Sequence, residues 1–326
     1  MPLMLESLNK FQPRTKNPAC PVASERVVVA RRREAASLRG MGSEPVFSIL
    51  GPEAPRSPVV LAVPHAGRFY PPELIEQARV PMERLRALED RHADSLVEQA
   101  VAEGATAVVA HMARAVIDLN RDPREIDPAM VEDVISADRL VLSGKVRAGL
   151  GLFPRRLPAC GELWRRRISL EETERRIAEA HEPYHRALAE RIEAARRSFG
   201  VAILIDCHSM PPLPVRQAGG PVRIVVGDRF GAGASAAVVD VAMAVIEGAG
   251  LRSARNHPYA GGYTIDRHGR PRRKVHAIQI EFDRSLYLDA TLDAPTPNLQ
   301  ACGTLLATIA AELRELFDPS LPIAAE

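Results

Sequence analysis

The sequence lacks most features that would place a chain outside the ordinary globular proteins. Its four cysteines, Cys20, Cys160, Cys207 and Cys302, lie far from one another in the chain, which favours a reducing compartment over a disulfide scaffold. No apolar run reaches the length of a transmembrane helix, because charges or prolines interrupt each one. The N-terminus has no hydrophobic core of the signal-peptide kind. We therefore expect a cytoplasmic protein that makes no contact with a membrane.

Lysine is also scarce. Among 43 basic residues the lysines are Lys10, Lys16, Lys145 and Lys274, and the rest are arginine. The formal net charge is only +2, so no overall field attracts nucleic acid. Because the arginine clusters have no interleaved aromatic residues and match no known nucleic-acid motif, we predict no nucleic-acid partner.

The length of 326 residues, with 46% hydrophobic and 26% charged residues, is typical of one large domain or two closely joined ones. Residues 1–44 carry arginine and proline with little periodicity. We interpret them as a disordered N-terminal extension, or as sequence that precedes a true start at Met41. We assign residues 45–318 to one domain and residues 319–326 to a C-terminal tail.

Strand and helix patterns alternate along this domain. Short apolar runs predict strands at Val59–Val63, 105–110, 115–119, 201–205, 223–226 and 275–282. Helical spacing predicts helices at 82–103, 169–199 with a break near Pro183, 232–248 and 299–317. The alternation predicts a single doubly wound α/β domain.

Several predicted strands end in or carry residues whose side chains can bind ligands or take part in catalysis. His65 and His208 each follow an apolar run, Asn120 and Arg121 end a third, and Glu281 lies in a fourth. In an open α/β sheet, ligands bind at the carboxyl ends of the strands. These side chains could form one shared site with metal ligands, an anion clamp and a general base.

Each of these residues also has a simpler interpretation. Lone histidines are often structural, Arg121 could pair with Asp122 or Glu125 at the surface, and Glu281 could form a salt bridge with Arg284. Asp206, two residues before His208, could orient that histidine, since alternate residues of a strand share a face. The intervening Cys207 would then point into the core.

A third metal ligand could come from the segment 89–94. On a helix, Asp90 and Asp94 would share a face while His92 pointed elsewhere. Asp90 and His92 could therefore serve one site only if this stretch is a loop. An exposed, polar helix start is the alternative.

Taken together, these segments resemble the N-formylglutamate amidohydrolase family. The matching stretches follow the family's order over roughly residues 47–315 and are 63–67, 70–74, 89–92, 116–123, 151–154, 206–211, 256–263 and 279–287. The resemblance implies a fold similar to that of zinc-dependent exopeptidases, with a mixed sheet flanked by helices. One departure is Arg68, which stands where the wider carboxypeptidase pattern has a glutamate ligand.

The resemblance further implies a division of roles within the site. Zinc would be held by His65, Asp90 and His208, with His92 as the alternative to Asp90, and Glu281 would be the general base. Arg121 with Asn120 would hold a substrate carboxylate. From the residues themselves, Arg114 could neutralise the developing oxyanion or lie at the surface. A loop containing Tyr259, Gly261, Gly262 and Tyr263 could close over the substrate or form a plain surface turn.

The implied reaction is hydrolysis of a small acidic substrate, N-formyl-L-glutamate, to formate and glutamate, as in histidine degradation. Another N-acyl amino acid is an alternative substrate. Two further alternatives are a serine or cysteine hydrolase that uses Ser209 or Cys207 with His208, and a binding protein with an empty metal site.

Overall fold

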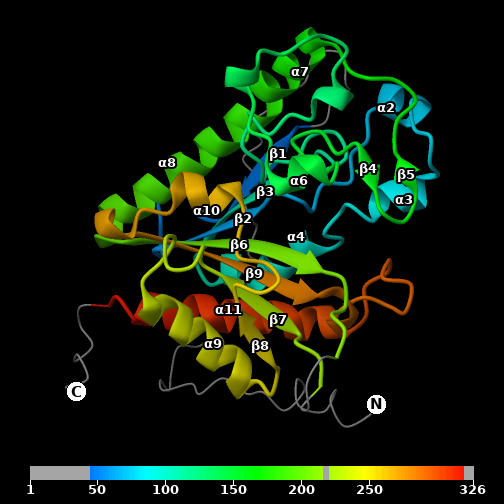
Figure 1. Cartoon of the computed structure of the whole chain (residues 1–326). Helices are drawn as coiled ribbons and strands as arrows, with labels where there is room; N and C mark the ends of the chain where they lie inside the picture. The colour runs from blue at the N-terminus through cyan, green and yellow to red at the C-terminus, as the bar shows by residue number, and fades with distance from the viewer. Residues whose placement is uncertain (1–44, 216–219, 319–326) are drawn as a thin grey trace.

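A computed structural model describes residues 45–215 and 220–318, so the assignments for 1–44 and 319–326 lie outside the described residues. A seven-stranded sheet forms the centre, in the order β1-β3-β2-β6-β9-β7-β8 (Figure 1). The strands are β1 (Phe47–Leu50), β2 (Val59–Val63), β3 (Thr106–Ala110), β6 (Ala202–Met210), β7 (Ile224–Gly227), β8 (Ser253–Arg255) and β9 (Val275–Asp283). The sheet confirms the predicted α/β class.

The sheet is mixed, as the resemblance implied. Strands β3, β2, β6 and β9 are parallel neighbours, whereas β1 runs antiparallel to β3 and β7 runs antiparallel to β9. The central pair β6 and β9 is in register over nine residues, from Ala202 opposite Val275 to Met210 opposite Asp283. All residues of both strands are buried, which fits strands covered on both faces.

Helices cover both faces of the sheet (Figure 1). On one face a hydrophobic cluster joins the sheet to α4 (Ala93–Leu96), α5 (Glu98–Ala102), α9 (Ala236–Gly248) and α11 (Asn298–Glu315). On the other face a second cluster joins it to α8 (Glu182–Phe199) and α10 (Tyr263–His268). None of the helices in the described residues is long and apolar enough to span a bilayer.

One end of the sheet is covered by short elements and loops (Figure 1). These are α2 (Pro72–Glu76), α3 (Met82–Arg86), α6 (Gly144–Arg147), the two-stranded β4 (Arg156–Leu157) and β5 (Gly161–Glu162), and 3-10 turns at Pro128–Met130 and Ala137–Arg139. Two further 3-10 turns, Pro271–Arg273 and Arg284–Leu286, flank β9.

The long helical segment predicted at 169–199 has the expected start and an interrupted middle. The Ser169 hydroxyl accepts a hydrogen bond from the Glu172 amide at 3.1 Å and so caps α7 (Leu170–Arg176). A π-helical turn, Ile177–His181, then separates α7 from α8. The predicted break near Pro183 is therefore a π turn just before that proline.

Two predicted elements are wrong. Residues 82–103 are not one helix, because α3 ends at Arg86 and a loop with His92 in a left-handed conformation (φ 60°) precedes α4. The Asp90 amide donates to the His65 carbonyl at 2.9 Å, which holds this loop against the end of β2. Residues 115–119 are not a strand. Their apolar side chains are buried in the second cluster, but the backbone forms turns and bonds to Leu152.

Candidate metal centre and active site

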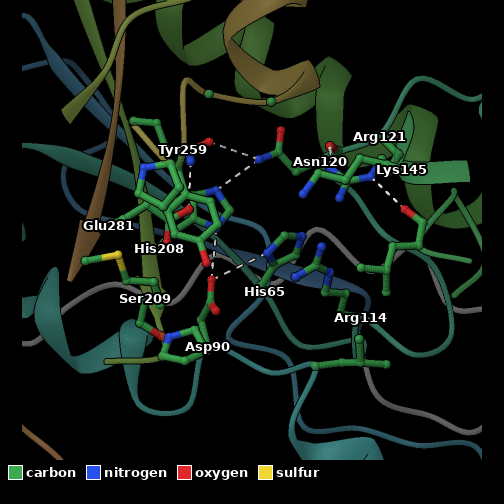
Figure 2. A pocket seen from close by; sticks show the side chains of 18 of the residues that line it. His65, Asp90, Arg114, Asn120, Arg121, Lys145, His208, Ser209, Tyr259 and Glu281 are labelled. Carbon is green, nitrogen blue, oxygen red and sulfur yellow. Dashed lines mark hydrogen bonds and ion pairs between the residues drawn. The ribbon is translucent and has the colours of Figure 1, made fainter. Parts of the chain in front are cut away.

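The carboxyl ends of β2, β6 and β9 lie at the same edge of the sheet, and His65, His208 and Glu281 lie together there (Figure 2). His65 lies two residues beyond β2, and His208 lies within β6. Glu281 on β9 is the residue paired with His208 in the parallel register. Because paired residues of adjacent strands share a face, the register places this carboxylate beside the histidine.

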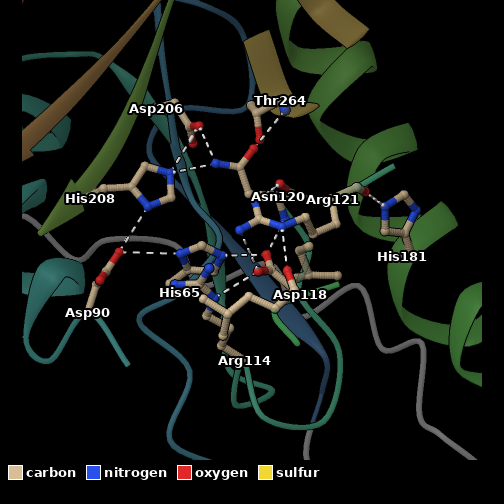
Figure 3. Close-up of polar contacts among 12 residues, drawn as sticks. His65, Asp90, Arg114, Asp118, Asn120, Arg121, His181, Asp206, His208 and Thr264 are labelled. Atoms are coloured by element: carbon tan, nitrogen blue, oxygen red, sulfur yellow. Dashed lines mark hydrogen bonds and ion pairs between the residues drawn. The ribbon is translucent and has the colours of Figure 1, made fainter. Parts of the chain in front are cut away.

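Asp90 lies between the two histidines (Figure 3). Its Oδ2 is 2.9 Å from His208 Nδ1 and 3.4 Å from His65 Nδ1, while its Oδ1 accepts from Arg284 Nη2 at 2.9 Å. The candidate ligand atoms of His65, Asp90 and His208 all lie within 4.8 Å of one another. The structure thus brings Asp90, and not the alternative His92, to both histidines. The segment that carries Asp90 is a loop and not the exposed helix start that was the alternative.

In both histidines the Nε2 atom, called the outer nitrogen because it faces away from Asp90, contacts a carboxylate. His65 Nε2 lies 2.7 Å from Asp118 Oδ1, and His208 Nε2 lies 3.0 Å from Asp206 Oδ2. The expected orienting role of Asp206 is consistent with this contact. Such carboxylate–histidine contacts fix ring orientation in metal sites. They leave both Nδ1 atoms facing Asp90, and His65 Nδ1 is buried without a hydrogen-bond partner among the described residues.

Burial makes the electrostatics of this group strong. Burial alone would raise the pKa of Asp90, but the hydrogen bond from His208 and the nearby imidazole of His65 hold it well below its usual value. Burial opposes protonation of His208, yet the Asp206 and Asp90 carboxylates raise its pKa well above the usual value. Burial raises the pKa of Glu281 to about 7, with the charge of His208 acting against the shift.

Glu281 is not paired with Arg284, which was the simpler interpretation of its burial. Its carboxylate accepts from Gln279 Nε2 at 2.7 Å. Arg284 donates instead to Asp90 and, at 3.0 Å, to the Ser209 hydroxyl. Glu281 is therefore a buried carboxylate on the wall of the site whose hydrogen bond comes from a neutral amide.

Asn120 and Arg121 lie in a turn and not at a strand end. Arg121 is buried, and its guanidinium donates to the carbonyls of Asn120 (2.8 Å) and Leu150 (3.0 Å). It makes no surface pair with Asp122, which binds Arg124 instead. Arg121 therefore presents a positive charge to the site. The carboxylate nearest to its guanidinium is that of Asp118, which is 3.7 Å away and also pairs with Arg114.

Asn120 lies between the two histidines of the site and the loop that contains Gly261 and Gly262. Its amide nitrogen lies 3.1 Å from His208 Nε2 and 3.2 Å from Asp206 Oδ2, and its oxygen accepts from the Thr264 amide at 2.8 Å. A Cβ at Gly262 would lie 2.5 Å from that oxygen. Glycine is thus required at position 262 for this close approach.

These residues enclose a cavity of about 290 Å³. The predicted residues that line it are His65, Asp90, Arg114, Asn120, Arg121, His208, Tyr259, Gly261, Gly262 and Glu281. Arg114 also pairs with Asp118 at 2.8 Å. Tyr263 lines a neighbouring hollow of about 850 Å³ and packs against His181 and His185. It therefore lies next to the catalytic cavity and does not line it.

Other residues of the site were not predicted. Gln279 and Lys145 line the cavity, and Asp118 holds His65. Asp118 stands inside the motif 116–123, so its spacing from Arg121 was a usable signal. Lys145 is one of four lysines in the chain, and that rarity was a further signal.

A second group of histidines, here called the brace histidines (His181, His185 and His268), was also missed. His181 Nε2 bonds the Arg121 carbonyl at 2.9 Å, and His185 Nε2 bonds the Leu119 carbonyl at 2.8 Å. His185 Nδ1 lies 3.0 Å from His268 Nε2. Burial lowers the pKa of His181 to about 4 and that of His268 to about 3. The spacing of four residues between His181 and His185 was visible, but their backbone partners were not.

A cysteine or serine nucleophile does not fit this arrangement. Cys207 is fully buried in the core cluster on the opposite side of β6 from His208, and burial raises its pKa well above the usual value. The Ser209 hydroxyl is occupied as an acceptor for Arg284. Cys207 is thus the core residue that was expected.

Comparison with known proteins agrees with the fold and the site. Residues 57–288 match the family model described as N-formylglutamate amidohydrolase. The chain belongs to this family. It is therefore a hydrolase that acts on an amide. This membership confirms the resemblance inferred from the motifs.

Similar proteins include two curated relatives and two solved structures. The N-formylglutamate deformylase of Pseudomonas aeruginosa is 31% identical over 72% of this chain and 83% of its own length. That of Pseudomonas putida is 28% identical, over 72% and 84%. The crystal structure of N-formylglutamate amidohydrolase from Ralstonia eutropha JMP134 is 33% identical, with a TM-score of 0.76 over 83% of this chain and 98% of its own. A gene product of Agrobacterium tumefaciens shares the fold at 18% identity and a TM-score of 0.57, over 84% and 95%.

Proposed function

We propose that this chain is a metal-dependent deformylase that hydrolyses N-formyl-L-glutamate, or a closely similar N-acyl acidic amino acid, to formate and the free amino acid. The observation that carries the proposal is the convergence of His65, Asp90 and His208 at the end of the sheet. The substrate is inferred from the names of the relatives, and the dependence on metal from the side chains of this site.

Two imidazoles and one carboxylate suit a catalytic zinc ion, which takes three protein ligands and leaves one position open. The buried Nδ1 of His65 has no hydrogen-bond partner among the described residues, and a metal ion would satisfy it. When bound, such an ion would supply Lewis-acid chemistry and make a water molecule acidic. Asp118 and Asp206 would keep both rings directed at the ion through their Nε2 atoms.

In this mechanism Glu281 is the general base. Its carboxylate takes a proton from the attacking water and returns it to the nitrogen of the leaving amino acid. Burial raises the pKa of this carboxylate, which makes it a better proton acceptor. The hydrogen bond from Gln279 holds the carboxylate toward the cavity.

The arginines of the cavity orient the substrate. Arg121 offers a planar guanidinium to the substrate carboxylate, with the Asn120 amide beside it. Arg114, held by Asp118, is placed to stabilise negative charge that develops on the carbonyl oxygen. Tyr259, Gly261 and Gly262 also line the cavity.

The test is metal analysis of the purified protein, combined with hydrolysis assays on N-formyl-L-glutamate, N-formyl-L-aspartate and N-acetyl-L-glutamate. We expect about one divalent ion per chain. We also expect loss of activity after chelation and its return with zinc. A chelated, metal-free protein that keeps full activity would contradict the metal-dependent mechanism. Failure to cleave any of the substrates would contradict the proposed substrate class.

The role of Arg121 has a sharper test. Arg121→Lys keeps the charge but loses the planar fork, so binding of a carboxylate should weaken. The expected cost is about 2 kcal/mol, or roughly 30-fold in kcat/KM. Arg124→Lys is the matched control, because Arg124 is exposed and pairs with Asp122 outside the cavity. Equal kinetics for both variants would remove Arg121 from the carboxylate site.

A further inference from the structure

We propose that Lys145 selects the acidic side chain of the substrate, by binding the second carboxylate while Arg121 binds the first. This inference rests on the proposed function and names a specificity residue within the same site. It makes the enzyme selective for dicarboxylic N-acyl amino acids.

Lys145 is placed between two hollows. It is the second residue of α6, a short helix whose start is capped by the Ser143 hydroxyl. Its side chain lines both the cavity of about 290 Å³ and the neighbouring hollow of about 850 Å³, and Arg121 lines both as well. Figure 2 shows Lys145 next to Arg121, on the side of the cavity away from Glu281.

Most cations around the catalytic cavity already have carboxylate partners. Arg114 pairs with Asp118 at 2.8 Å, and Arg284 pairs with Asp90 at 2.9 Å. Arg121 donates to two carbonyls and lies 3.7 Å from the Asp118 carboxylate.

The arginines of the larger hollow also have partners. Arg229 pairs with Asp266 at 2.7 Å, Arg267 donates to the Tyr263 hydroxyl at 2.7 Å, and Arg270 donates to the Asp266 carbonyl at 2.9 Å. The Lys145 ammonium is the exception. Within residues 45–215 and 220–318 it has neither an ion pair nor a side-chain hydrogen bond.

An unpaired ammonium beside two guanidiniums is unfavourable unless an anion joins them. Burial lowers the pKa of Lys145, and the charges of Arg121 and Arg114 lower it further. A substrate with one carboxylate can satisfy Arg121 but leaves Lys145 unmatched. A substrate with two carboxylates satisfies both. Lysine suits the second position because its point charge sits on a flexible stem and can follow a mobile side chain.

The experiment compares N-formyl-L-glutamate with N-formyl-L-glutamine, which has nearly the same shape but a neutral side chain. For Lys145→Met we expect kcat/KM on N-formyl-L-glutamate to fall by about tenfold, mainly through KM, since one partly exposed charge-assisted contact is lost. The preference for glutamate over glutamine should fall by the same factor. Lys145→Arg should restore most of the preference, because it restores the charge.

Two control variants separate this role from general effects. Arg147→Met removes an exposed charge from the same helix, and Lys274→Met removes the other lysine in the described residues. Both should keep the wild-type preference, and all four proteins should keep their metal content and melting temperature.

The outcomes distinguish this inference from the proposed function. If Lys145→Met lowers kcat/KM equally on both substrates, or leaves it unchanged on both, then Lys145 does not select the acidic side chain. The inference is then overturned while the proposed function stands. If the wild-type protein cleaves neither these two substrates nor N-formyl-L-aspartate or N-acetyl-L-glutamate, the proposed function itself fails, and the inference fails with it.

Discussion

Two groups of histidines lie on either side of the Asn120–Arg121 turn, and they differ in what holds their rings. In the candidate metal centre, the outer nitrogens of His65 and His208 face the carboxylates of Asp118 and Asp206 (Figure 3). Among the brace histidines, two ring nitrogens face backbone carbonyls. All five side chains are buried, so burial alone does not explain their different properties.

The partner of the outer nitrogen accounts for the difference. A carboxylate stabilises positive charge on the ring and makes the inner nitrogen a better ligand. A carbonyl needs only a neutral N–H donor, so burial dominates and lowers the pKa, as it does for His181. The first arrangement suits metal binding, and the second ties α8 and the π turn before it to the backbone at 119–121.

The largest contrast should come from removing one ring of each group. His208→Ala should lose bound metal and activity to background while the protein stays folded, because a ligand is gone. His185→Ala should keep its metal, but its free energy of unfolding should fall by about 1–3 kcal/mol, since the Leu119 carbonyl loses its donor. Metal analysis and urea unfolding of both variants check this. Full metal occupancy in His208→Ala would exclude that residue as a ligand.

Glu281→Gln tests the chemistry that accompanies the first group. The amide keeps the shape of the side chain but cannot take a proton, so kcat should fall by roughly 10²–10⁴ while metal content stays constant. A parallel loss of metal would instead make Glu281 a ligand. A wild-type kcat would reject it as the base.

Asp206→Asn tests the carboxylate anchor itself. The substitution preserves size but weakens the contact that orients His208, and we expect metal affinity to fall by about 10–100-fold. Competition with a chelator measures this affinity. Asp228→Asn is the matched control, because Asp228 is a buried aspartate that pairs with Arg255 and not with a histidine. An equal affinity in both variants would remove the anchor from the argument.

The smallest effect should be a change in the pH dependence of stability. The folded protein keeps His181 neutral down to about pH 4, whereas the unfolded chain binds a proton below its usual pKa near 6.5. Stability is therefore lost as pH falls from 6.5 toward 4, and His181 contributes about 2 kcal/mol of this loss between pH 7 and pH 5.

His181→Gln should reduce that difference by the same amount without changing metal content. Urea unfolding of metal-free protein at the two pH values measures it. The exposed His257, changed to Gln, should leave the difference as in wild type. A His181→Gln variant with the full wild-type difference would show that the brace histidines do not titrate as a buried neutral group.

The sequence predicted best those features that depend on local pattern. Val59–Val63 is a strand with the predicted bounds, and the rings of His65 and His208, both near strand ends, lie 4.7 Å apart between their centroids. The family motif also pointed to Asp90 as the third candidate ligand, and its carboxylate lies against both histidines. These signals are short runs of residues whose meaning does not depend on distant partners.

The failures have a common physical cause. The run at 115–119 is buried, but its backbone forms turns and the Asp118 amide bonds the Leu152 carbonyl, and an apolar pattern cannot distinguish such a buried turn from a strand. The helix predicted at 82–103 is interrupted because the Asp90 amide bonds the His65 carbonyl. The brace histidines bind backbone carbonyls at 119 and 121. In each case a contact between distant segments decides the outcome.

The nine-residue pairing of β6 with β9 determines which parts of the protein can move without unfolding of the whole domain. His208 and Glu281 are directly paired within it, both strands are fully buried, and each has a further strand on its other side. Amide hydrogens in such a central pair exchange with solvent mainly when the whole domain opens, whereas loops exchange through local fluctuations. Asp90, Arg121, Lys145 and Tyr259 lie outside the sheet. Any slow rearrangement that admits substrate must therefore occur in these loops and short elements, while Glu281 and His208 stay in place.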